Sequence, residues 1–255
     1  MIQILDHGDV RELRLDRPPA NALSPELIAA LRAAVEEAPA AGARALVLSG
    51  APGFFSGGLD VPYLIHLDRS AIAVAWRDFY GLLGSLAGSP IPVAAAITGH
   101  SPAGGAVMSI FCDVRIMAEG ADGGYRIGLN EVQVGIPMPP VIFQALRRQV
   151  GAREAERLCV TAQLVPAAEA LHIGLVDELV APEGVVARAV EWCKSILAMP
   201  PEAMAITRRL ARADLVSLFE ANEAELAALV DMWFSAETQG ALRALVERLA
   251  KRTRA

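Results

Sequence analysis

Two glycine-rich turns are the parts of this chain best suited to chemistry. One reads FFSGGLD at residues 54–60 and follows a strand-like run at 44–48, and the other reads SPAGG at 101–105 and follows a strand-like run at 91–98. Each turn leads into a segment with helical character. Backbone N–H groups at a helix start lack partners inside the helix and carry partial positive charge, and glycine lets a ligand approach them closely. The two turns can therefore aim two N–H groups at one oxygen atom.

The glycine spacing at 101–105 narrows the kind of anion that this turn could hold. It matches neither the phosphate loop G-x-x-x-x-G-K-[ST] nor the dinucleotide motif G-x-G-x-x-G. An oxyanion hole is favoured instead, in which preorganised donors stabilise charge on a carbonyl oxygen, and losing one donor typically costs about 3–4 kcal/mol of barrier. A tight strand-to-helix connection without a ligand is the alternative. Because there are two such turns, we expect a reaction through an enolate or a tetrahedral anion.

Glu131 is the candidate for proton transfer. It lies in the largely apolar run IGLNEVQVGIP at 127–137. Partial desolvation raises the pKa of a carboxyl group, which suits acid–base catalysis. For an isolated glutamate, an acidic residue favoured by a helix N-terminus is the alternative. The assignment of Glu131 therefore depends on its combination with the two turns.

Together these segments resemble the crotonase family, the enoyl-CoA hydratase and isomerase superfamily, over nearly the whole chain. The resemblance implies an α/β fold, a ClpP/crotonase-like spiral of ββα units with a C-terminal helical trimerisation region. It also implies that Leu59 and Gly104 supply the oxyanion-hole N–H groups and that Glu131 is catalytic. The substrate-binding residues that it implies are Gly57, Gly58, Leu59, Asp60, Val61, Gly104, Asn130, Ala20 and Ala22.

Val107 distinguishes between the chemistries of this family. The resemblance provides two positions for catalytic carboxylates, and they fall on Val107 and Glu131. Hydratases of the family use two carboxylates to position and activate water, and a valine can neither accept a proton nor hold that water. Isomerisation is therefore favoured over hydration. Four segments are also similar to mitochondrial-type Δ3,Δ2-enoyl-CoA isomerases, namely 17–24, 101–105, 128–131 and 232–235.

The reaction implied by the resemblance is isomerisation of 3-enoyl-CoA to 2-trans-enoyl-CoA in fatty-acid β-oxidation. Glu131 would take a proton from C2 and return it to C4, with the enolate oxygen held by the two turns. No metal is needed, and no cofactor beyond the coenzyme A of the substrate. Another acyl-CoA reaction at the same site (hydration, hydrolysis or decarboxylation) and a non-catalytic acyl-CoA-binding trimer stay open. Two departures from the family pattern are Gly57, where alanine is more frequent, and the prolines at 137–140.

Strand-like and helical runs alternate through most of the chain, which predicts a sheet with right-handed crossovers. Strands are expected at 8–15, 44–48, 91–98, 114–117 and 175–179, and helices at 25–37 and 71–87. Ser24 before Pro25 supplies an N-cap followed by proline at the first helical position. From residue 200 the pattern is helical only, with a bend at 211–214. We therefore expect an α/β core at 1–199 and a helical subdomain at 200–255.

Composition and charge bear on the partners. The chain has 255 residues, 54% hydrophobic and only 20% charged, which predicts a large core and a surface covered by other subunits. The resemblance implies that these subunits form a homotrimer or a dimer of trimers. A net charge of −6 argues against nucleic-acid binding. Recognition of the CoA phosphates would need local cations, with solvated surface charge the alternative for each candidate. These candidates are Arg17, Arg248, Lys251, Arg252 and Arg254.

The remaining polar and aromatic residues are less informative. Four scattered histidines and three widely spaced cysteines indicate no metal site and fit buried thiols in a reducing compartment. His100 either supports the second turn or is a structural histidine. No signal peptide or bilayer-spanning run is found, so we expect a cytoplasmic protein without membrane contact, with an organelle as the alternative if a presequence has been removed. Six residues could line a fatty-acyl pocket, with core packing the alternative for each: Phe54, Phe55, Met138, Phe143, Trp233 and Phe234.

Overall fold

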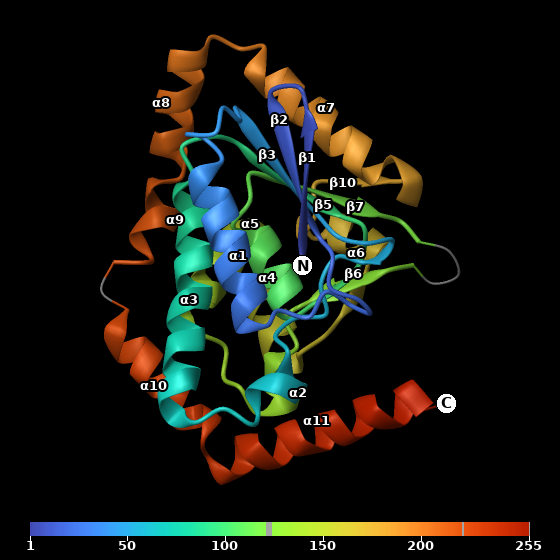
Figure 1. Ribbon diagram of the computed structural model, residues 1–255, viewed down its shortest axis with the longest axis vertical. Coiled ribbons are helices and arrows are strands. Elements are labelled where there is room, and N and C mark those ends of the chain that lie inside the picture. The colour runs from blue at the N-terminus through green and yellow to red at the C-terminus, as the bar shows by residue number, and fades with distance from the viewer. Residues whose placement is uncertain (121–123, 221, 255) are drawn as a thin grey trace.

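A six-stranded sheet lies at the centre of the computed structural model, which describes residues 1–120, 124–220 and 222–254 (Figure 1). Its strand order is β1-β2-β3-β5-β7-β10. Strands β1 (Ile2–His7) and β2 (Val10–Leu15) are antiparallel, and every other neighbouring pair is parallel. Strands β3 (Ala45–Ser49) and β5 (Val93–Ile97) are buried along their whole length. Parallel strands covered on both faces are expected to be apolar throughout, and these two are largely so.

The chain builds a second, smaller sheet alongside the first by repeating a strand–strand–helix unit. Each unit gives its first strand to the large sheet and its second to the small sheet, which has the order β4-β6-β8-β9. The expected spiral of ββα units is thereby confirmed. The elements of the three units are β3, β4 (Gly53–Phe54), α2 (Val61–Leu64) and α3 (Arg69–Gly88); β5, β6 (Gly99–Pro102) and α4 (Gly104–Ile110); and β7 (Val114–Ala118), β8 (Arg126–Gly128), the 3₁₀ helix η1 (Glu131–Val134) and α5 (Pro140–Thr161).

Helices cover both faces of the large sheet. On one face α7 (Val185–Leu197) buries Val185, Ala189 and Cys193 against the sheet. On the other, α1 (Pro25–Glu37), α3 and α4 share the larger hydrophobic core, and Figure 1 shows α1 and α3 on the opposite side of the strands from α7. The short elements between η1 and α7 are β9 (Val165–Pro166), α6 (Ala167–His172), β10 (Glu178–Val180) and η2 (Pro182–Gly184).

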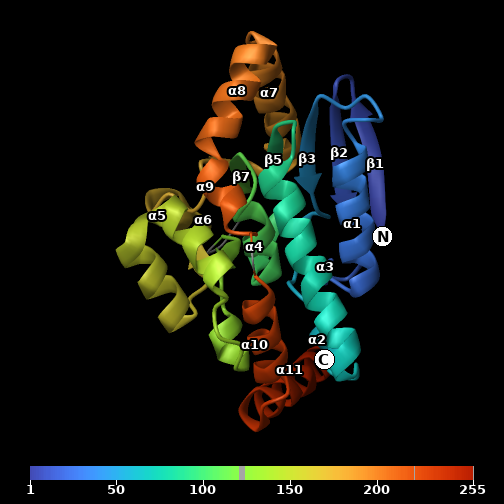
Figure 2. The same ribbon diagram turned by 90° about the vertical axis from the view of Figure 1, so that its left-hand side faces the viewer.

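After residue 200 the chain is helical, as expected. The elements are α8 (Pro201–Ala211), α9 (Ala213–Ser217), α10 (Glu223–Trp233) and α11 (Ala236–Arg254). The break between α8 and α9 falls within the predicted bend at 211–214. Figure 2 shows these helices passing down one side of the molecule to α11 at its lower end. None of the helices, over the residues that the structure describes, is both long enough and apolar enough to span a bilayer.

Local signals predicted several boundaries correctly. Helix α1 spans the predicted 25–37, with the Ser24 hydroxyl accepting a hydrogen bond from Leu27 N–H at 3.3 Å and Pro25 in its first turn. Helix α3 begins two residues earlier than predicted because the Asp68 carboxylate accepts a hydrogen bond from Ala71 N–H and caps it.

Two strand predictions were wrong in extent. The run at 8–15 is a turn followed by β2, and its antiparallel partner β1 was missed. The last strand covers residues 178–180 rather than 175–179. Leu175 and Val176 donate their N–H groups to Ala170 O, at the end of α6, so these backbone groups are not available to the sheet.

Candidate active site

Three site segments begin at one edge of the small sheet. Strands β4, β6 and β8 are mutually parallel neighbours, and they end directly before the turns at 55–60, 103–104 and 129–131. Neighbouring strands lie about 5 Å apart, and parallel strands end at a common edge. Two further hydrogen bonds join the turns, from Phe55 N–H to His100 O at 3.0 Å and from Ala103 N–H to Gly128 O at 2.8 Å. The fold thus brings together the three segments that the sequence singled out.

The first turn is held by the segment at 20–23. Gly57 N–H donates to Ala20 O at 2.7 Å, Leu23 N–H donates to Gly58 O at 2.8 Å, and Asp60 N–H donates to Leu23 O at 3.0 Å. Leu59 N–H lies between these bonded groups and donates to no protein acceptor in the described parts of the chain. This N–H group is therefore free for a ligand.

The second turn leaves a matching donor. Ala103 has the unusual backbone angles φ 48° and ψ −123°, and Gly104 is the first residue of α4. A non-glycine residue in this region costs about 1–3 kcal/mol, and such strain is found at sites where the backbone direction matters. Gly104 N–H, like Leu59 N–H, donates to no protein acceptor within the described residues.

The two donors are close neighbours. A Cβ atom added to Gly58, at φ +86°, would lie 3.2 Å from Gly104 N, and one added to Gly104 would lie 3.5 Å from Leu59 N and 2.9 Å from Leu23 Cδ1. Side chains at these two positions would therefore crowd the space between the turns. Two N–H groups placed in this way can stabilise negative charge on a single oxygen.

Glu131 opens η1, three residues beyond the end of β8. Part of the residue is accessible, but its carboxylate atom Oε2 is buried and has no hydrogen-bond partner within the described residues. Burial raises the pKa of this carboxyl group to about 7, and a backbone N–H offsets the effect only partly. A carboxyl group with a pKa near neutrality can both take up and return a proton.

Asn130, directly before Glu131, also has a buried acceptor without a partner. Its Oδ1 atom is bonded to nothing in the part of the chain that the structure describes, and its side chain does not cap η1. A buried acceptor left unpaired costs about 1–3 kcal/mol, so a ligand N–H or O–H near Asn130 would be favoured.

The turn that carries Glu131 is fixed from two directions, and the sequence did not indicate this. Thr238 of α11 donates its hydroxyl to Gly135 O at 2.6 Å, and Gln133 donates its side-chain amide to Ala162 O at 2.9 Å. A Cβ atom at Gly135 would lie only 2.9 Å from Thr238 Cα. Helix α11 therefore packs directly against the turn that positions Glu131. No local pattern in the sequence links residues about a hundred positions apart.

Arg17 makes contacts within the first turn, and its candidacy for the CoA phosphates stays a prediction. Its guanidinium pairs with the Asp60 carboxylate at 2.5 Å and donates to Ala22 O at 3.0 Å. Asp60 in turn caps α2, whose first residue is the buried Val61. Arg17 thus stabilises the first turn through this ion pair and hydrogen bond. Of the other candidate cations, Arg248 and Lys251 are exposed on α11, and the side chains of Arg252 and Arg254 lie outside the described residues.

Val107 lies one turn into α4 and is 1% exposed. It is surrounded by the main hydrophobic core and offers no group that could accept a proton. Of the two positions where a carboxylate was expected, 107 and 131, only position 131 has one.

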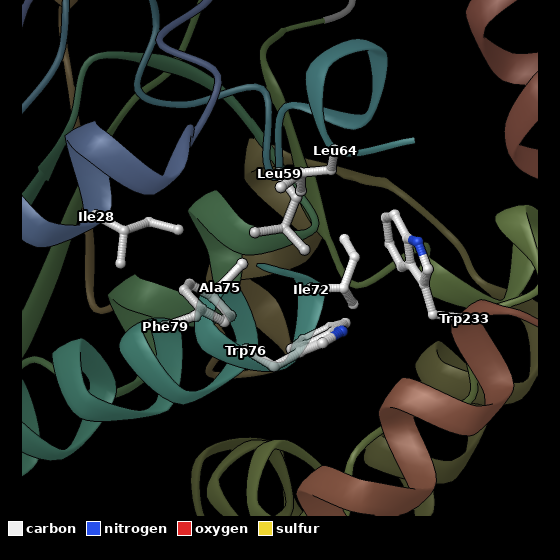
Figure 3. Close-up of a pocket in the computed structure, with 8 residues that line it drawn as sticks. All are labelled: Ile28, Leu59, Leu64, Ile72, Ala75, Trp76, Phe79 and Trp233. Atoms are coloured by element: carbon white, nitrogen blue, oxygen red, sulfur yellow. The ribbon is translucent and has the colours of Figure 1, made fainter. Parts of the chain in front are cut away.

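A narrow apolar cavity adjoins Leu59 (Figure 3). Its free volume is about 10 Å³, which is enough for about one water molecule. Its lining residues are Ile28, Leu59, Leu64, Ile72, Ala75, Trp76, Phe79 and Trp233. Four of them, at 72, 75, 76 and 79, have the spacing of one helix face, which is the signal by which the sequence could have identified them.

Trp233 is the one residue of the six expected pocket residues that lines this cavity. Phe55 is fully buried in the core, Phe54 stacks on His100 with ring centroids 5.3 Å apart, and Arg69 lies over the Phe234 ring. Met138 and Phe143 also pack against the core. Core packing was the alternative considered for each, and it applies to Phe55, Met138, Phe143 and Phe234.

His100 has a structural environment. Its ring accepts a hydrogen bond from Arg126 N–H at 3.1 Å and lies edge-on to Tyr125, and burial lowers its pKa. Cys112, Cys159 and Cys193 are buried and free. Burial, together with the nearby charge of Glu131, raises the pKa of Cys159 to about 11. Over the residues described, no three His, Cys, Asp or Glu side chains are grouped as a metal site.

Known proteins match the chain over nearly its whole length. A family model described as enoyl-CoA hydratase/isomerase matches residues 6–252. The human protein named enoyl-CoA delta isomerase 1, mitochondrial, is 32% identical over 94% of this chain and 80% of its own length. A probable enoyl-CoA hydratase, echA17 of Mycobacterium avium, is also 32% identical, over 84% of this chain and 80% of its own length.

The fold agrees with these sequence matches. The crystal structure of human mitochondrial Δ3,Δ2-enoyl-CoA isomerase superposes with a TM-score of 0.93 at 31% identity, covering 98% of both chains. Relatives with equal identity carry isomerase and hydratase names, so identity alone does not choose between the two reactions. On the family model, the curated relatives and the fold together, the chain belongs to the enoyl-CoA hydratase/isomerase family.

Proposed function

We propose that the protein isomerises 3-enoyl-CoA to 2-trans-enoyl-CoA. The observation that carries the proposal is the Glu131 carboxylate, whose Oε2 atom is buried without a partner among the described residues, together with two free N–H donors, Leu59 and Gly104. The family relatives support an enoyl-CoA reaction. Val107 in place of a second carboxylate favours proton transfer over addition of water.

In the proposed mechanism, the thioester oxygen accepts hydrogen bonds from Leu59 N–H and Gly104 N–H. The Glu131 carboxylate removes a proton from C2, and the electrons of that C–H bond form the C1–C2 double bond of a dienolate. Charge then develops on the oxygen, where the two donors stabilise it. Protonated Glu131 returns the proton to C4, the double bond moves to C2–C3, and the carbonyl re-forms.

The reaction is balanced without another reactant, since the proton removed is the proton returned. We therefore propose no cofactor besides the coenzyme A that belongs to the substrate. Asn130 Oδ1, unpaired and next to Glu131, would accept a hydrogen bond from an amide N–H of the substrate.

Product analysis with two substrates tests this function. Purified protein is incubated with 3-hexenoyl-CoA and, separately, with 2-trans-hexenoyl-CoA, and the products are followed by ultraviolet absorbance and mass. Conjugation of the first substrate without a change of mass supports the isomerase. Gain of one water by the second, with no conjugation of the first, means a hydratase, the alternative that the probable hydratase relatives favour.

Further features of the assignment stay predictions. These are assembly into a trimer or a dimer of trimers, a boundary between core and helical subdomain at 199/200, the absence of nucleic-acid partners and a cytoplasmic location. Light scattering after size exclusion tests the assembly. The mitochondrial names belong to the relatives.

A further inference from the structure

We propose, on the basis of the proposed function, that the Thr238 hydroxyl positions Glu131 by holding the peptide group between Gly135 and Ile136. Thr238 lies in the first turn of α11, a helix outside the repeated units, and it is fully buried. Its hydroxyl donates to Gly135 O at 2.6 Å, at the end of the turn that Glu131 begins. Thr238 thus acts on the proposed base from outside the site.

This peptide group is held at both ends. Gly135 O and Ile136 N–H belong to one planar unit, since rotation about a peptide bond is strongly restricted. Thr238 binds the oxygen, and Ile136 N–H donates to Glu131 O at 3.2 Å. If the peptide group rotated, both hydrogen bonds would be lost together. The Thr238 hydroxyl is therefore connected to the backbone of Glu131 through a single rigid group.

The turn has few internal restraints that would replace this one. It is a four-residue 3₁₀ helix, Glu131–Val134, and such helices stay short because their hydrogen bonds have poor geometry. Its first turn has no side-chain cap, and it ends at Gly135 with φ 72°, where glycine leaves the backbone free to rotate. Gln133 anchors the middle of the turn at Ala162 O and leaves the peptide group after Gly135 to Thr238.

The Thr238 hydroxyl is itself oriented by Ser235. The Ser235 hydroxyl donates to Thr238 Oγ1 at 3.0 Å and accepts a hydrogen bond from Thr238 N–H at 3.1 Å, which caps α11. Because Thr238 Oγ1 accepts from Ser235, its own proton is directed to Gly135 O. The start of α11 therefore aims one buried donor at the turn.

The orientation of the turn decides how well the Glu131 carboxyl group is shielded from water. Its Oε2 atom is buried without a partner in the described residues, and burial together with its own backbone N–H sets its pKa. The titratable group that faces it is the buried thiol of Cys159 on α5, which stays neutral because its pKa is raised to about 11. Glu237, next to Thr238 on α11, is exposed. A turn that loosened would admit water to the Glu131 carboxyl group and lower its pKa towards the ordinary value.

Thr238→Val tests the inference, because it removes the hydroxyl and keeps the shape of the side chain. The misplaced base should lower kcat by at least about tenfold, whereas KM should stay within about threefold, because binding does not use the base. The midpoint of the pH profile of kcat/KM should fall from about 7 by at least about one pH unit. Thr238→Ser keeps the donor and should restore kcat and the midpoint. Initial rates between pH 5 and 9 measure them, and an unmoved midpoint in folded Thr238→Val overturns the proposal.

A matched control separates positioning from a general loss of stability. Thr98, 7% exposed, donates its hydroxyl to Ala51 O at 3.1 Å, so Thr98→Val removes the same kind of hydrogen bond outside the turn of Glu131. It should lower the unfolding temperature but keep the wild-type kcat and midpoint. A midpoint that moves equally in Thr98→Val and Thr238→Val overturns the proposal. If Thr238→Val does not fold, Thr238→Ala takes its place, because it removes the hydroxyl without setting a methyl group against Gly135 O.

Unfolding without substrate separates this inference from the proposed function. The effect of Glu131→Gln on the free energy of unfolding is measured with urea at pH 4.5 and pH 8, once in the wild-type protein and once in Thr238→Val. In the wild-type protein the advantage of glutamine should grow with pH, because the pKa of Glu131 is raised by burial. In Thr238→Val that growth should fall to about half or less, since water then reaches the carboxyl group. This result would support the positioning role even if the reaction proves to be hydration, and equal growth in the two backgrounds overturns it whatever reaction is found.

Discussion

Two glutamates with buried carboxyl groups have opposite surroundings in this molecule. The Glu12 carboxylate lies in the large sheet and accepts hydrogen bonds from Ser49 at 2.6 Å and Arg14 at 2.8 Å, with His7 at 2.9 Å. Burial opposes its ionisation, but these bonds outweigh burial and hold the pKa of Glu12 below its ordinary value. Glu131, beyond the small sheet, has an Oε2 atom without a partner, and burial raises its pKa to about 7.

The difference separates stability and reactivity between the two sheets. In the large sheet, a buried polar group such as Glu12 of β2 is paired. The second strands of the repeated units end in turns that leave Leu59 N–H, Gly104 N–H and Glu131 Oε2 without partners among the described residues. Groups left unpaired cost stability, and they are also the groups that a substrate can use.

The largest effect is expected from Glu131→Gln, which keeps the shape of the side chain and removes its basicity. Isomerisation should fall by about a thousandfold, while the affinity for a saturated acyl-CoA changes little, because no other acid–base group is proposed. Steady-state rates and calorimetric binding measure the two quantities. A loss below tenfold would place the base elsewhere. Glu12→Gln is the matched control and should keep the wild-type rate, provided that it is folded.

Glu12→Ala should be the most damaging of these changes to stability. It leaves Ser49 and Arg14 without their partner and opens space in the sheet, so the free energy of unfolding at pH 7 should fall by about 2–4 kcal/mol. Urea unfolding measures it. A change below 0.5 kcal/mol, on the scale of an ordinary surface substitution, would mean that the carboxylate is not buried as described.

Glu131→Gln should act on stability in the opposite direction. Because the folded-state pKa of Glu131 is raised, the protonated form favours folding, and this contribution is lost as pH rises from about 4.5 to about 7. At pH 8 the variant should be more stable than the wild-type protein by about 3 kcal/mol, and at pH 4.5 nearly equal to it. Urea unfolding at both values checks this, and an equal difference at the two pH values would contradict it. Glu12 has the opposite sign, so its contribution is lost as pH falls below about 4.5.

The rate should follow the ionisation of Glu131. Only the carboxylate can take the C2 proton, so kcat/KM should rise about tenfold per pH unit below about pH 7 and then level off. Initial rates between pH 5 and 9 give this profile, with protein refolded or returned to pH 7.5 as the check for inactivation. A profile that is flat between pH 5 and 7 would show that Glu131 is not the titrating base.

Val107→Glu is expected to have the smallest effect on activity, a trace of hydratase product. It places a second carboxylate one turn into α4, where hydratases of the family carry one, and a trace of 3-hydroxyacyl-CoA should form from 2-trans-hexenoyl-CoA. Because Val107 is 1% exposed, the variant should also lose stability. Product mass detects the hydroxyacyl thioester, and Val107→Gln, which cannot act as a base, should form none.

Much of this site could be predicted because its signals are local. The glycines at 57, 58, 104 and 105 predict two turns, and Glu131 lies in an apolar run that follows a strand. The repeated ββα units could be expected from the resemblance. The strands of the small sheet, some only two residues long, are too short to show a periodic pattern. Strand β1 was missed because none of its residues is fully buried, so it lacks a clearly apolar face.

The groups that fix the site could not be predicted from local patterns. Arg17 meets Asp60 across 43 positions and Thr238 meets Gly135 across 103, and both contacts exist only once the chain is folded. The unusual backbone of Ala103 likewise has no signature in its residue type. Sequence spacing thus indicated the candidate reacting groups, and tertiary contacts explain why they stay in place.

The placement of the tryptophans gives the protein a built-in optical probe. The chain has three tryptophans, and two of them, Trp76 and Trp233, line the apolar cavity that adjoins Leu59, while Trp192 packs on the other face of the sheet. In a Trp192→Phe background all indole emission would come from the surroundings of Leu59. Binding of an unlabelled acyl-CoA beside Leu59 could then be followed by fluorescence, and stopped-flow mixing would time binding separately from the chemical step.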